Sequence, residues 1–128
     1  MTRTRSRQVL GSLFILAGLN HFWQPRFYTA IMPEYLPAHA ALVAASGYAE
    51  IGLGALTFVP GADYLSRWSL IALLIAVFPA NLHMAMHPER YRRIPPLLLW
   101  LRLPLHAVLI GWVWWATAPE LAFAHAPD

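Results

Sequence analysis

Seven polar or ionisable side chains interrupt the otherwise apolar stretches of this sequence, and their types are those that do chemistry in proteins. Charged side chains cost about 2.5–3.5 kcal/mol each at the centre of a lipid bilayer, so in an apolar setting they need a partner or a function. We therefore predict that they form a ligand pocket. The seven candidates are Asn20, His21, Glu50, Asn81, His83, Arg102 and His106.

The spacing of these residues suggests how they combine. Glu50 and Arg102 carry opposite charges, and a long arginine side chain can bridge a difference in depth, so we expect an ion pair between them. Arg102 and His106 are four residues apart and share one helical face. Pro79, just before Asn81, can kink its helix around the site. The alternative interpretation is a charge pair that only locks the helices together.

The chemistry of the pocket follows from the residue types. Histidines with Glu50 could form a site of two or three imidazoles and one carboxylate for a metal. The histidines differ in estimated depth by up to about 10 Å, however, and Arg102 repels cations. These features disfavour metal and axial haem ligation and favour a quinone-like or other small polar-headed ligand. The chain has no cysteine, which excludes iron–sulfur ligation and thiol catalysis by this chain alone.

Helices of membrane-spanning length must position these residues, and a span takes about 20 residues. Three apolar runs are long enough, at 40–59, 68–86 and 97–117, and a shorter fourth run covers 9–23. The fourth could instead be a secretory signal, but no small-x-small cleavage site follows it. We therefore predict a retained first helix and an antiparallel bundle of four membrane helices. In projection, all seven polar residues then lie in the same half of the bundle.

The connecting segments and the glycines add detail to this bundle. Residues 24–37 contain three prolines and many apolar side chains, which predicts an interfacial segment between the first two spans. Residues 1–8 form a basic N-terminal segment and residues 118–128 a short C-terminal tail. Small residues line the first two spans and predict close packing of these two helices. They are Gly11 and Gly18 in the first span, and Ser46, Gly47, Gly52, Gly54 and Ala55 in the second.

Composition supports an integral membrane protein. The 128 residues are 59% apolar and 12% charged, whereas soluble domains carry about 25% charged residues. The positive charges are nine arginines, of which two groups of three, within residues 3–7 and 90–93, flank apolar runs. The arginines form no basic face, so we expect no nucleic acid and the lipid bilayer as partner. The sequence predicts an all-α, multi-pass protein of the cell inner (plasma) membrane, with one domain over residues 9–117.

Four motifs in order resemble those of the DoxX-like family of small four-helix membrane proteins, over about residues 13–115. They are Gly18-Leu19-Asn20-His21-Phe22 with Ile31-Met32-Pro33-Glu34-Tyr35-Leu36-Pro37, Gly47-Tyr48-Ala49-Glu50, Pro79-Ala80-Asn81-Leu82-His83, and Arg102-Leu103-Pro104-Leu105-His106. The resemblance implies a four-helix membrane protein. It also implies a link to quinone and quinol oxidation, although most relatives are described only as oxidoreductases by inference or as proteins of unknown role.

Two functional interpretations follow. The first is an accessory subunit of membrane redox chemistry, whose polar half-bundle binds a quinone-type headgroup and which works with a partner membrane subunit. The second is a non-enzymatic assembly, chaperone-like or structural partner of another membrane protein. A third interpretation, a pathway for a solute or protons, has less support than these two, because the other half of the bundle offers no polar route across the membrane.

Overall fold

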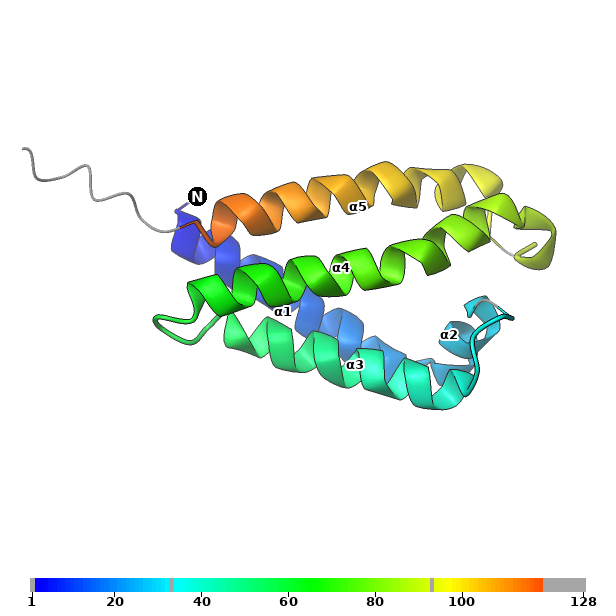
Figure 1. Ribbon diagram of the computed structural model, residues 1–128, viewed down its shortest axis with the longest axis horizontal. Coiled ribbons are helices and arrows are strands. Elements are labelled where there is room, and N and C mark those ends of the chain that lie inside the picture. The colour runs from blue at the N-terminus through cyan, green and yellow to red at the C-terminus, as the bar shows by residue number, and fades with distance from the viewer. Residues whose placement is uncertain (1, 33, 93, 119–128) are drawn as a thin grey trace, which may run out of the picture.

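The computed structural model describes residues 2–32, 34–92 and 94–118, and this part of the chain is all-helical, as predicted (Figure 1). Four helices are long and one is short, and a single 3-10 turn precedes the last long helix. In chain order they are α1 (Arg3–Trp23), α2 (Pro25–Ile31), α3 (His39–Leu56), α4 (Asp63–Met86), η1 (Pro88–Arg90) and α5 (Pro96–Ala116).

The helix boundaries show what starts each element. The Thr2 hydroxyl accepts a hydrogen bond from the Arg5 backbone N–H, at 3.2 Å, so α1 begins within the basic segment and not after it. Within the 24–37 segment, Pro25 occupies the first position of α2, and Pro96 does the same for α5, because proline has no N–H to leave unpaired there. Arg93 and the C-terminal tail from residue 119 onward lie outside the described residues.

Length and apolar composition single out two helices as able to cross a membrane. These are α4, with 24 residues, and α5, with 21 residues. The other two predicted spans, α1 and α3, are not among them. Polar residues lower the hydropathy of α1 at both ends, with arginines at its start and Asn20 and His21 at its end, and α3 contains His39 and Glu50.

The four long helices pack as two layers. In one layer α1 lies mainly against α3, and in the other α4 lies mainly against α5 (Figure 1). The layers meet at the end of the molecule where α1 begins. There Leu10, Leu70 and Val113 are completely buried, and Trp112 Nε1 donates a 2.6 Å hydrogen bond to the Ser6 hydroxyl. Arg7 pairs with Asp63 at the same end.

Glycines bring the α1 and α3 backbones into direct contact, as the small residues predict. A Cβ atom added to Gly54 would lie 2.6 Å from the carbonyl oxygen of Gly11, and one added to Gly18 would lie 2.7 Å from that of Gly47. Gly52 has no neighbour within 4 Å and faces outward. The first layer is therefore held together along its length without intervening side chains.

The two layers diverge toward the end that carries α2 (Figure 1). At this end they are linked across the gap by side chains of the connecting segments. Arg90 Nη1 lies 2.9 Å from Glu34 Oε1, and the ring of Tyr35 packs edge-on against His83 with centroids 5.4 Å apart. The divergence leaves room between the layers for the cavity that forms the candidate site.

The glycine contact predicts a position-specific effect within α3. Gly54→Ala should destabilise the protein by about 1–3 kcal/mol, because the added methyl group would force the backbones apart. Gly52→Ala, two residues away on the open face, should be neutral or stabilising by up to about 1 kcal/mol. Equilibrium unfolding followed by circular dichroism measures both, and equal stabilities of the two variants would contradict the packing.

Candidate functional site

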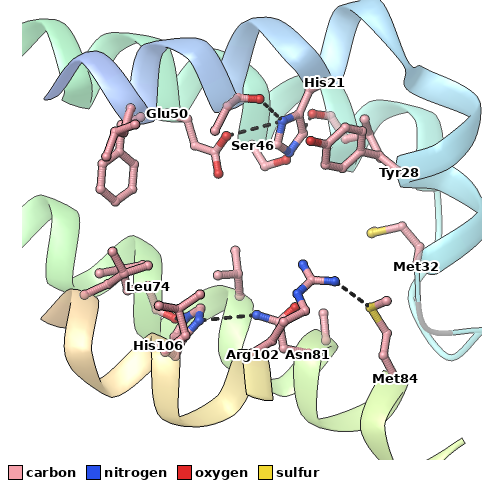
Figure 2. A pocket seen from close by; sticks show the side chains of 18 of the residues that line it. His21, Tyr28, Met32, Ser46, Glu50, Leu74, Asn81, Met84, Arg102 and His106 are labelled. Atoms are coloured by element: carbon pink, nitrogen blue, oxygen red, sulfur yellow. Dashed lines mark hydrogen bonds and ion pairs between the residues drawn. The ribbon is translucent and has the colours of Figure 1, made fainter. Parts of the chain in front are cut away.

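A cavity of about 440 Å³ lies between the two layers, with α2 at its end (Figure 2). Ligand pockets commonly measure about 300–1,000 Å³, so this one accommodates a small ring system. One wall comes from α1, α2 and α3 and the other from α4 and α5. Five of the seven predicted residues line it: His21, Glu50, Asn81, Arg102 and His106.

Glu50 and His21 form the polar part of the first wall. Glu50 Oε2 lies 3.3 Å from His21 Nδ1, and the same nitrogen lies 2.8 Å from the carbonyl oxygen of Ala17. Both neighbours are acceptors, so Nδ1 carries the hydrogen and donates it to the Ala17 carbonyl. Glu50 Oε2 is consequently buried without a hydrogen bond of good geometry.

Tyr28 on α2 completes this wall, and sequence reasoning did not find it. Its ring stacks on His21 with centroids 3.9 Å apart and 17° between the planes. Asn20 Nδ2 donates a 2.8 Å hydrogen bond to the Tyr28 hydroxyl. Asn20 therefore does not line the cavity, and it positions the tyrosine that does. In the sequence, Tyr28 is one of several aromatic residues in the segment 24–37, which was predicted to lie at the membrane interface and not in the site.

Asn81 and His106 form a fixed unit in the second wall. His106 Nε2 lies 2.5 Å from the carbonyl oxygen of Leu74, and Asn81 Nδ2 lies 3.3 Å from His106 Nδ1. A carbonyl oxygen only accepts, so Nε2 carries the hydrogen and Nδ1 accepts from the amide. Leu74 immediately precedes Ile75 in α4. The carbonyl of Ile75 has no helical hydrogen-bond donor, because Pro79, four residues later, has no N–H.

Arg102 extends into the cavity from the second wall with few polar partners (Figure 2). Among the described residues its hydrogen bond is to the Met84 sulfur, with Nη1 and Sδ 3.8 Å apart. A guanidinium has five N–H donors, and a thioether is a weak acceptor. Most of the hydrogen-bonding capacity of Arg102 is thus available to a molecule in the cavity.

The predicted Glu50–Arg102 ion pair is wrong. Glu50 projects from α3 and Arg102 from α5, and the cavity separates the two walls (Figure 2). Each has its nearest described partner within its own layer, His21 for Glu50 and Met84 for Arg102. The charges therefore face the same space without touching, because the layers diverge at this depth.

His83 lies outside the cavity at the end of α4. Its ring stacks on His87 with centroids 4.3 Å apart, and its Nδ1 is buried without a hydrogen bond. Two further lining residues, Met32 and Met84, flank the α2 end of the cavity and escaped sequence reasoning. Within the described ranges, no group of three or more His, Asp or Glu side chains is arranged to hold a metal ion.

Chemically, the cavity presents complementary walls. The first offers a carboxylate oxygen that can accept a hydrogen bond or a proton, beside an imidazole. The second offers a guanidinium that can donate several hydrogen bonds. Between and beyond them the lining is apolar, with residues such as Phe14, Leu74 and Leu109. This combination suits a neutral ring with polar groups on opposite edges and an apolar substituent.

Residues 10–117 match a family described as a domain of unknown function (DUF8561). No curated protein and no solved structure matches the chain.

Double-mutant cycles test the separation of Glu50 from Arg102. The pair Glu50→Gln and His21→Gln should show a coupling energy above about 0.5 kcal/mol, because these side chains are in contact. The pair Glu50→Gln and Arg102→Gln should show a smaller one, because the cavity lies between them. The free energy of unfolding of each single and double variant gives both values. A larger coupling for Glu50 with Arg102 would restore the ion pair.

Proposed function

The chain belongs to the DUF8561 family, and from the geometry of its cavity we propose that it is a multi-pass integral membrane protein that binds a quinone-type headgroup. In this proposal the protein is an accessory subunit of membrane redox chemistry. It holds the headgroup at a fixed place in the bilayer for a partner membrane subunit that carries the electrons.

The exposed surface of α4 and α5 supports the membrane location. In the most apolar 18-residue windows of these helices, only 28% and 17% of the residues are buried. Apolar helices in the core of a water-soluble protein are mostly buried, whereas these direct large apolar side chains outward. Trp100, Leu101 and Val108, for example, are between 50% and 64% exposed. A continuous apolar surface of this kind requires an apolar solvent or a partner.

Features of the first layer support a bundle of four membrane helices. Leu16 and Leu19 on α1 are 62% and 51% exposed, so the apolar surface continues onto this layer. With a rise of about 1.5 Å per residue, the four long helices measure about 27–36 Å, close to the thickness of about 30 Å of the hydrocarbon core. Exposed aromatic side chains gather at both ends, Trp68 at one and Trp23 at the other, as in membrane-interface belts.

The observation that carries the ligand proposal is the state of Arg102. Placing the charged Arg102 side chain inside an apolar bundle costs free energy unless its N–H groups donate hydrogen bonds. Its described partner is the Met84 thioether, and its guanidinium faces the cavity. A carbonyl oxygen of a bound ring would supply the acceptor that the protein itself does not.

The opposite wall narrows the class of ligand. There Glu50 Oε2 is buried beside His21, and the other carboxylate oxygen points into the cavity (Figure 2), so the ligand's opposite edge should offer a donor. A fatty-acid carboxylate would satisfy Arg102 but would bring a second acceptor toward Glu50. A quinone ring in its reduced form carries oxygens on opposite edges, and its hydroxyl groups can accept from Arg102 and donate to Glu50.

The four motifs that resemble those of the DoxX-like proteins agree with this proposal, although Asn20 and His83 in the same motifs lie outside the cavity. His21 belongs to the first motif, Glu50 to the second, Asn81 to the third, and Arg102 and His106 to the fourth. All five side chains line one cavity although they come from four helices. A purely structural set of polar residues has no reason to converge around an open space.

Membrane integration predicts the behaviour of the full-length protein during fractionation. It should sediment with plasma-membrane fragments and stay in the pellet after an alkaline carbonate wash, because its apolar outer surface has no favourable contact with water. Detergent should release it. Immunoblotting of the fractions measures this, and release by carbonate alone would contradict integration.

Ligand binding predicts distinct effects of the two walls. Arg102→Leu should weaken binding of a short-tailed ubiquinone or menaquinone analogue about tenfold or more, because hydrogen bonds from a charged group contribute about 1.5–3 kcal/mol. Glu50→Gln should weaken the quinol more than the quinone, because only the quinol donates to this carboxylate. Titration of purified protein measures both effects.

The matched control for these variants is Arg92→Leu, which removes an exposed arginine outside the cavity and should leave binding unchanged. Equal binding by the unchanged protein, Glu50→Gln and Arg102→Leu would overturn the proposal. In that case the role of a non-enzymatic partner for another membrane protein would become the better interpretation.

A further inference from the structure

The cavity is open along one long side of the molecule, between α1 and α5. Its lining residues on these helices include Leu13 and Leu105, which are 48% and 53% exposed. By contrast Val43 on α3 and Leu74 on α4, which also line it, are each only 4% exposed. The opening therefore lies on the outer surface of the bundle, between α1 and α5.

The packing of α1 and α5 explains this opening. They are joined near the beginning of α1 and the end of α5, where Trp112 donates to Ser6. Contacts between these two helices are few compared with those inside each layer, so beyond this junction they separate as the layers diverge (Figure 1). In the proposed membrane orientation, the gap opens to the hydrocarbon of the bilayer.

The rim of the opening is apolar and adjoins the polar site. Leu13 is ten residues before the end of α1, which places it about 15 Å from that end and near the middle of the bilayer. Leu105 is three residues after Arg102 on α5, so the two side chains are neighbours on one side of the helix. An apolar substituent on a ring held at Arg102 can therefore pass directly to the rim.

The cavity is too small to enclose a ring together with a long substituent, so the substituent must extend out of the cavity. At about 440 Å³ the cavity is toward the small end of ligand pockets, which span about 300–1,000 Å³. A quinone ring and the beginning of its chain fill a space of this size. The remainder of a long isoprenoid chain has to lie outside the protein.

We propose that the gap between α1 and α5 is a lateral portal, through which a headgroup with one long apolar chain enters from the bilayer. The chain remains in the portal between Leu13 and Leu105 while the ring occupies the site. This inference rests on the proposed function and specifies its ligand as a long-tailed quinone, selected over the same headgroup without a tail.

Tryptophan substitutions at the rim test the portal. Leu13→Trp and Leu105→Trp place an indole in the path of the chain, whereas Leu16→Trp and Val108→Trp place it on exposed positions of the same helices outside the cavity. The probes are a long-tailed ubiquinone and its tail-less dimethoxy-methyl-benzoquinone headgroup. Both are titrated into each protein in micelles of one detergent.

The unchanged protein should bind the long-tailed ubiquinone more tightly than the tail-less headgroup. The two rim variants should bind the long-tailed ubiquinone about tenfold more weakly and the tail-less headgroup within about twofold of the unchanged protein. The two control variants should match the unchanged protein with both probes. This pattern would support the portal, because only an obstruction of the tail separates the two ligands.

Two results would overturn the portal while leaving the quinone site in place. One is unchanged binding of the long-tailed ubiquinone by both rim variants. The other is an equal loss of both probes in both rim variants, which would show that the indole fills the ring site. Binding of neither probe by the unchanged protein would instead remove the proposed function, and the portal with it.

Discussion

The direct contact between the α1 and α3 backbones is the constraint on which the rest of the structure depends. At Gly11 and Gly54, and again at Gly18 and Gly47, no side chain separates the two helices. These helices therefore behave as one layer, and they cannot tilt separately to follow α4 and α5. The second layer can meet the first closely only at one end, so the space at the other end persists as a cavity.

Most polar side chains form their hydrogen bonds within their own layer. Only a few polar groups are therefore left to bind a ligand. In the first layer His21 donates to a carbonyl of its own helix and Asn20 to Tyr28. In the second layer His106 is held by Asn81 and a backbone carbonyl. The groups left over are a Glu50 oxygen and the Arg102 guanidinium, and they face each other across the cavity. Fixed walls of this kind keep their geometry when a ligand enters, which limits the entropy lost on binding.

The sequence was sufficient to predict the all-helical fold, the glycine contact and five of the cavity residues, because each depends on patterns along one helix. It could not predict that Glu50 and Arg102 stand apart, since depth along an axis does not determine the distance between helices. His83 is two residues from Asn81, and residues at that spacing do not share a helical face. Tyr28 was missed because its stacking on His21 depends on the direction in which α2 folds back.

The half-exposed leucines at the rim have a consequence for how tightly the site needs to bind. In the proposed membrane orientation a ligand reaches the cavity from the bilayer, where the concentration of a lipophilic molecule greatly exceeds its concentration in water. Partitioning thus supplies much of the free energy of occupancy before any contact with the protein forms. In this proposal the polar walls serve mainly to discriminate between headgroups, and lipid acyl chains are the competitors that a ligand must displace.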